Sequence, residues 1–81
     1  MNIKVKFFSS HREAVGQDSL LLDLEEGTSI DQVVELLISD YPKISELLNF
    51  TVLSLNHNYA QGEDILKDGD ELAMFPPVGG G

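Results

Sequence analysis

The sequence predicts an α+β fold in which one mixed β-sheet wraps around one main helix. Three observations lead to this prediction. Segments near both ends of the chain alternate apolar and polar residues with the period of a half-buried strand. A stripe of apolar residues with helical spacing lies between them. The chain has 81 residues and no cysteine, so one well-filled core must stabilise a single small domain.

The first third of the chain predicts two strands separated by a helical turn. Residues 2–7 alternate apolar and polar side chains, which predicts a strand with one buried face over residues 2–8. Residues 9–16 break the alternation and end in a glycine, so we expect one short helical turn there. The alternation returns at residues 18–24 and indicates a second strand. The apolar positions of the two strands are Ile3, Val5, Phe7, Leu20, Leu22 and Leu24.

The centre of the chain predicts the main helix. A turn at residues 25–27 is followed by Thr28, and Asp31 three residues later gives a pattern close to a capping box. We therefore expect the helix to begin at Thr28. Pro42 lacks an N–H group and disfavours helical geometry at the preceding residue, so the helix should end near Asp40. The apolar stripe consists of Ile30, Val33, Val34, Leu37, Ile38 and Tyr41.

The last third of the chain predicts a brief second helical segment and two further strands. Residues 44–48 carry apolar side chains at helical spacing. Residues 51–55 are β-branched and apolar, and the turn-forming residues 56–58 follow them. After another turn at residues 67–70, alternation at residues 71–75 indicates the last strand, which ends abruptly because two prolines follow.

The order of these elements allows the first and last strands to pair in parallel across the helical connection. The expected architecture is therefore a β-grasp (ubiquitin-like) roll. We expect this domain to span residues 1–75 and an extended tail to span residues 76–81.

The charge balance excludes several classes of partner. With 14 acidic and 5 basic side chains, the formal net charge is -9, which repels nucleic acid and anionic lipid. A basic protein surface is the expected partner. The sequence contains no long apolar block of a membrane span or a signal peptide, and the absence of cysteine gives no sign of an oxidising compartment, so we expect a cytoplasmic protein.

No residue pattern predicts a catalytic or metal site within the domain. His11 and His57 have no partner at metal-binding spacing, and we expect both to lie in solvated loops or turns, without a metal. The carboxylate pairs at 25–26 and at Asp70 and Glu71 flank turns and are expected to be solvated, whereas a general acid needs a buried carboxyl group.

The C-terminal segment is the best candidate for a functional element. Pro76 and Pro77 begin it as a stiff extended spacer, and six residues at about 3.1 Å each project roughly 19 Å. Val78 adds one apolar anchor, and glycines at 79–81 let a chain pass through a narrow channel because they have no Cβ atom. The reactive group would then be the Gly81 carboxylate, which a partner must adenylate with ATP and magnesium before a nucleophile can replace AMP. The simpler interpretation is a frayed end, although a frayed end needs no such spacer.

Five segments resemble the small subunit of molybdopterin synthase, the MoaD family, and they cover nearly the whole chain in order. The specific part is the acidic turn at 68–71 followed by Phe75, two prolines, Val78 and the terminal Gly80 and Gly81. The sequence departs from the family at Gly79, where another small residue is frequent. The five segments are residues 4–8, 12–16, 55–58, 66–71 and 75–81.

The resemblance implies a sulfur carrier with a β-grasp fold. In that family a ubiquitin-activating-like enzyme adenylates the terminal glycine, here Gly81, and a persulfide donor converts it to a thiocarboxylate. The large synthase subunit binds the tail, and the thiocarboxylate donates sulfur to cyclic pyranopterin monophosphate in molybdenum cofactor biosynthesis. The resemblance further implies a heterotetramer. ATP, magnesium and the precursor bind to the partners, so this chain is not catalytic alone and holds no cofactor.

Phe75 is a candidate interface residue, because it lies on the opposite strand face from Leu72 and Met74. An equally weighted interpretation places Phe75 in a small cluster under the loop around Tyr59. For the whole chain, two other functions remain open. One is a thiamine-type sulfur carrier or a ubiquitin-like protein modifier, and the other is a β-grasp interaction module with a disordered tail.

Overall fold

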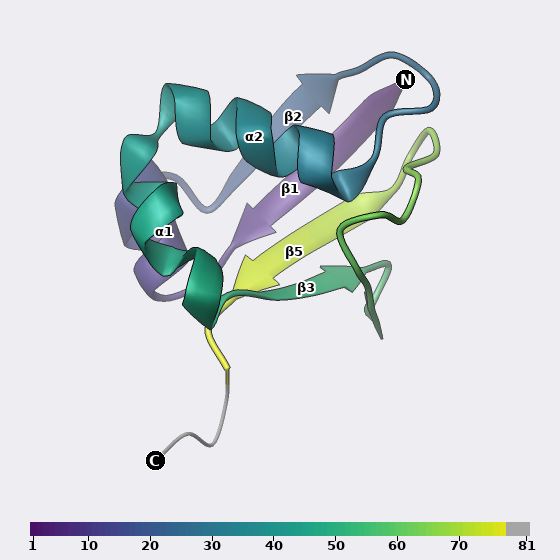
Figure 1. The fold of residues 1–81 in the computed structure, drawn as a ribbon. Coiled ribbons are helices and arrows are strands. Elements are labelled where there is room, and N and C mark those ends of the chain that lie inside the picture. Colours follow the sequence, from purple (N-terminus) through teal and green to yellow (C-terminus); the bar gives the residue numbers. More distant parts are fainter. Residues whose placement is uncertain (78–81) are drawn as a thin grey trace.

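The computed structural model describes residues 1–77 and contains one five-stranded mixed sheet in the order β2-β1-β5-β3-β4 (Figure 1). The first and last strands of the chain pair in parallel, and the other strand pairs are antiparallel. This arrangement confirms the predicted β-grasp roll. The strands are β1 (Asn2–Phe7), β2 (Ser19–Asp23), β3 (Val52–Leu55), β4 (Asn58–Tyr59) and β5 (Glu71–Phe75). The helices are α1 (Ser10–Val15), α2 (Ile30–Asp40) and the 3-10 helix η1 (Pro42–Phe50).

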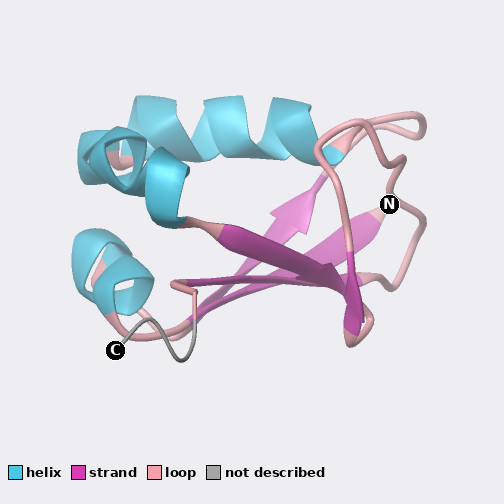
Figure 2. Cartoon of the chain, turned by 60° about the horizontal axis from the view of Figure 1, so that its bottom comes forward, coloured by secondary structure: helices cyan, strands magenta, loops and turns pink. Residues whose placement is uncertain are grey.

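The long helix α2 covers one face of the sheet, the two shorter helices lie towards one end of the sheet, and the opposite face carries no helix among the described residues (Figure 2). The alternation in β1 and β5 places every second side chain against α2. The buried apolar core consists of Ile3, Val5, Phe7, Val15, Ile30, Val33, Leu37, Ile44, Leu66, Leu72 and Met74. No helix in residues 1–77 has the length and apolar character needed to cross a bilayer.

The main helix begins one residue later than the sequence predicted. Ser29, not Thr28, is the N-cap, and its hydroxyl accepts from the Gln32 N–H while the Gln32 side chain accepts from the Ser29 N–H. Thr28 belongs to the preceding turn, because its N–H and hydroxyl groups both donate to the Glu25 carbonyl. The capping box predicted for Thr28 and Asp31 was therefore wrong by one position.

The two smaller helices lie where the sequence predicted them, but the second is longer than expected. Gly16 ends α1 in the left-handed conformation, with φ 83°, as its position predicted. The second helical segment, expected to be brief, is a nine-residue 3-10 helix that begins at Pro42. The two-residue strand β4 was not predicted.

Candidate functional site

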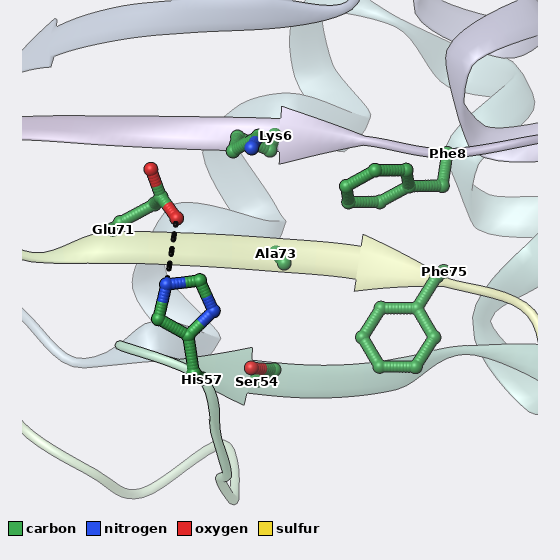
Figure 3. Close-up of a pocket in the computed structure, with 7 residues that line it drawn as sticks. All are labelled: Lys6, Phe8, Ser54, His57, Glu71, Ala73 and Phe75. Carbon is green, nitrogen blue, oxygen red and sulfur yellow. Dashed lines mark ion pairs between the residues drawn. The ribbon is translucent and has the colours of Figure 1, made fainter.

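The open face of the sheet carries a hollow of about 280 Å3 near its centre (Figure 3). Its floor is a row across three strands, because Lys6 pairs with Ala73 and Ala73 pairs with Ser54 in the strand register. Ala73 and Ser54 have short side chains, so the row is low in the middle. Larger side chains rise on two sides of this row: Phe8 and Phe75 at one end, and Glu71 and His57 at the other.

Two phenylalanines form the apolar end of the hollow. The rings of Phe8 and Phe75 meet edge to face, with centroids 6.3 Å apart and an interplanar angle of 83°. Phe8 is 42 % exposed, and the Lys6 ammonium lies over its ring, 5.6 Å from the centroid. The sequence pattern indicated Phe75 as an interface residue but did not indicate Phe8 or Lys6. Parallel pairing of β1 with β5 places these residues beside Phe75, and alternation from the buried Phe7 could have assigned Phe8 to this face.

Phe75 points away from the core, as its alternation with Leu72 and Met74 predicted. The other interpretation, a cluster under the loop around Tyr59, does not match the structure. Phe75 packs against Phe8 instead, and Tyr59 is 84 % exposed.

The polar end of the hollow depends on a tight turn. Asn56 and His57 both have positive φ values, 51° and 71°, and form the two-residue loop between β3 and β4. This turn places the His57 ring beside Glu71, with 3.8 Å between Nε2 and the carboxylate. His57 is exposed, as predicted, whereas Glu71 is half-buried.

Asp70 is buried, which corrects the expectation that it is solvated. Its carboxylate accepts from the Lys67 N–H at 2.7 Å and from the Asn56 side-chain amide at 2.9 Å. Asn56 in turn accepts from the Glu71 N–H. Asp70 therefore joins the turn before β5 to the loop after β3, and holds the loop that carries His57.

His11 is also buried, which contradicts the prediction of a solvated histidine. The Thr51 hydroxyl donates to the Leu47 carbonyl at 2.6 Å, so the His11 Nε2–H group must be the donor in its 2.7 Å contact with the Thr51 hydroxyl. His11 Nδ1 is buried without a partner. Burial lowers the pKa of His11 from 6.5, because the charged ring would lose its hydration. This pair joins α1 to the end of η1.

The tail leaves the sheet beside the aromatic pair. Phe8, Ser9, Phe75 and Pro76 line a second, apolar hollow at this point. Ser9 has φ 52° and ψ -123°, a backbone conformation that L-residues rarely adopt. Pro76 is half-buried and Pro77 is exposed. The predicted tail residues Val78, Gly79, Gly80 and Gly81 lie outside the described residues.

The arrangement presents an interaction surface, without an assembled set of catalytic groups in the part of the chain that the structure describes. No three potential metal ligands come together in residues 1–77. The aromatic pair lies next to Pro76, where the tail begins. A protein that docks on the open sheet face would therefore also contact the base of the tail.

A sequence model described as the ThiS family matches residues 5–81. A curated relative from Chlamydomonas reinhardtii, named molybdopterin synthase sulfur carrier subunit, is 34 % identical over 83 residues, and the alignment covers 100 % of both chains. The small archaeal modifier protein 1 (SAMP1) from Methanosarcina acetivorans is 28 % identical, with a TM-score of 0.80 over 99 % of this chain and 96 % of that chain.

A third similar protein has been solved together with another subunit. It comes from the complex of subunits 1 and 2 of the molybdopterin-converting factor of Helicobacter pylori. The two chains are 22 % identical with a TM-score of 0.71, and 100 % of each is covered. At this identity the similarity concerns the fold.

Proposed function

The chain belongs to the ThiS family, and from this we propose that it is the sulfur carrier subunit of a molybdopterin synthase. The observation that carries the proposal is the full-length similarity to a relative of that name, at 34 % identity with both chains covered completely. The fold is compatible with it, because β5 ends at Phe75 and the prolines that follow lie outside the sheet.

In this proposal the reacting group is the Gly81 carboxylate. A carboxylate in water is inert to acyl transfer, so an activating enzyme of the ubiquitin-activating type joins it to the AMP of ATP, with Mg2+ bound and pyrophosphate released. A persulfide sulfur of a donor protein then displaces AMP, and a thiol cleaves the resulting S–S bond to leave the thiocarboxylate and a disulfide. This chain supplies the acyl group, and its partners supply the catalysis and bind the cofactors.

The large synthase subunit binds the tail. Pro76 and Pro77 act as the spacer, and the residues after them pass through a narrow channel of that subunit. These residues are Val78, Gly79 and Gly80. The thiocarboxylate donates its sulfur to cyclic pyranopterin monophosphate, and water restores the Gly81 carboxylate. Two transfers complete the dithiolene. One carrier on each half of a dimeric large subunit gives a heterotetramer, which works in the cytoplasm.

The open sheet face supports the docking part of the proposal. The exposed Phe8 and the half-buried Phe75 form an aromatic pair next to Pro76, the described start of the tail. Aromatic side chains in such positions dominate the free energy of many interfaces. The Helicobacter pylori protein of the same fold is present in its structure together with a second subunit.

The decisive experiment measures conversion of the C-terminal carboxylate to a thiocarboxylate. The chain is incubated with the activating enzyme, ATP, Mg2+ and a persulfide donor, and intact mass spectrometry measures replacement of one oxygen by sulfur. A variant with one alanine added after Gly81 should keep its circular dichroism spectrum and lose both the sulfur gain and the synthesis of molybdopterin. Untrimmed extended protein that still supports synthesis would show that the terminus is not the site.

A second candidate is a ubiquitin-like protein modifier, because SAMP1 from Methanosarcina acetivorans is 28 % identical over nearly the full length. The two functions differ in the fate of the activated terminus. A modifier forms amide bonds to lysines of other proteins, whereas a carrier returns to its free carboxylate. Affinity purification from native lysate separates them, and co-purification of a thiazole synthase instead of the large synthase subunit would indicate a thiamine-type carrier.

A further inference from the structure

Lys6 is a half-buried cation beside the aromatic pair of Phe8 and Phe75. Like the other three lysines, Lys6 has no carboxylate within 4.0 Å of its ammonium group among residues 1–77. The carboxylate nearest in the hollow, Glu71, is directed to His57. Lys6 instead lies over the Phe8 ring, and Lys4, two residues away on the same strand face, adds a second positive charge.

Docking of a protein on this face would remove hydration from the Lys6 ammonium group, which costs free energy. The aromatic pair and the hollow would be covered, and the ammonium would lose water. The Phe8 ring compensates only part of this loss, since cation–π attraction is weaker than the hydration of a lysine. A partner that buries this face must therefore bring an acceptor to Lys6, and a carboxylate gives the strongest pair in a water-poor setting.

We propose that Lys6 selects the docking partner by pairing with an aspartate or glutamate side chain that enters the hollow beside Phe8. The inference rests on the proposed function, because it takes the large synthase subunit as the protein that covers this face. The hollow suits one side chain. Its volume of about 280 Å3 is below the range of roughly 300–1,000 Å3 that is typical of small-molecule sites.

Two other occupants fit the observations less well. A second copy of this chain could offer Glu71 to Lys6, but two chains of net charge -9 repel each other. A basic side chain from the partner could pair with Glu71, but it would approach Lys4 and Lys6 on the neighbouring strand. Charge complementarity at the Lys6 side of the hollow therefore favours an acidic group.

The test measures binding to the recombinant large synthase subunit from the same organism by isothermal titration calorimetry. Lys6→Glu should weaken binding about tenfold or more, Lys6→Met by a smaller factor, and Lys6→Arg should keep it. Lys43→Glu is the matched control, because it makes the same change in net charge at an exposed residue of η1 that does not line the hollow. It should change the affinity by less than about threefold. Thermal melts verify that all variants fold.

Carbodiimide cross-linking gives a direct measurement of the pair, because it joins a lysine amine to a carboxylate in contact with it. We expect a peptide that links Lys6 to an aspartate or glutamate of the large subunit, and none that contains Lys43. Equal losses for Lys6→Glu and Lys43→Glu would overturn the Lys6 pairing alone. Tighter binding of Lys6→Glu, or Lys6-dependent self-association of the chain, would assign the hollow to one of the other occupants. Failure of the unmodified chain to bind the large subunit would overturn the proposed function itself.

Discussion

The contact between His11 and Thr51 predicts a large cost for a nearly isosteric substitution, Thr51→Val. Valine keeps the shape of threonine but offers no acceptor to the buried His11 Nε2–H group, which donates to the Thr51 hydroxyl at 2.7 Å. A change of tautomer cannot relieve the loss, because Nδ1 is also buried and has no partner. One ring N–H group is then unsatisfied in either tautomer.

The expected magnitude follows from the cost of a buried unsatisfied donor, about 1–3 kcal/mol. We expect Thr51→Val to lower the free energy of unfolding by about 2 kcal/mol. For a domain of this size, each 1 kcal/mol corresponds to roughly 4–8 °C in Tm, so the melting temperature should fall by roughly 8–16 °C. Urea unfolding followed by circular dichroism measures the same difference, and the slope with urea should stay constant.

Two variants separate the hydrogen bond from the packing of the methyl group. Thr51→Ser keeps the hydroxyl and removes one methyl group, so it should cost only about 0.8 kcal/mol. In the double variant His11→Leu/Thr51→Val both partners are apolar, and it should be more stable than Thr51→Val alone. The reasoning would be refuted if Thr51→Val were as stable as the unmodified chain, or if it lost no more stability than Thr51→Ser loses.

Four further predictions follow from the structure. Because burial lowers the pKa of His11 below 6.5, the unfolded chain binds more protons than the folded chain under mildly acidic conditions. The free energy of unfolding should therefore be full above pH 6.5 and decrease as the pH falls towards the lowered pKa of His11. Urea titrations should show a weaker decrease for His11→Gln, and an equal decrease for that variant would contradict the prediction. Ser9→Gly should raise the free energy of unfolding by about 1 kcal/mol, since glycine adopts φ 52° without strain, and a loss in thermal melts would contradict the strain. Phe75→Ala should weaken binding to the large subunit by about 2 kcal/mol in calorimetry with little change in Tm, whereas a large loss of stability with normal binding would make its role structural. Stopped-flow association with the large subunit should slow as salt rises, because residues 63–71 contain five acidic side chains and one lysine; a salt-independent rate would exclude electrostatic steering.

The sequence by itself determined the features that depend on local periodicity and on local backbone restrictions. Alternation in residues 2–7 and 71–75 specified which side chains face the core, because successive residues of a strand point to opposite faces. Gly16 ended α1 and Pro42 followed α2, since these residues act on their own stretch of backbone. The order of the elements was enough to predict parallel pairing of the first and last strands.

Only the tertiary structure decided the environment of individual polar and aromatic residues. His11 is buried because η1 and Thr51, forty residues later in the chain, cover it, and Asp70 is buried because Asn56 reaches it from another loop. Lys6 and Phe8 join Phe75 on one face only because β1 lies next to β5. A hydrophobicity pattern reports the face on which a side chain lies, but not which distant side chain lies beside it. The burial of His11 and Asp70 and the composition of the docking face therefore depend on long-range packing, whereas the order and type of the elements depend on neighbours in the sequence.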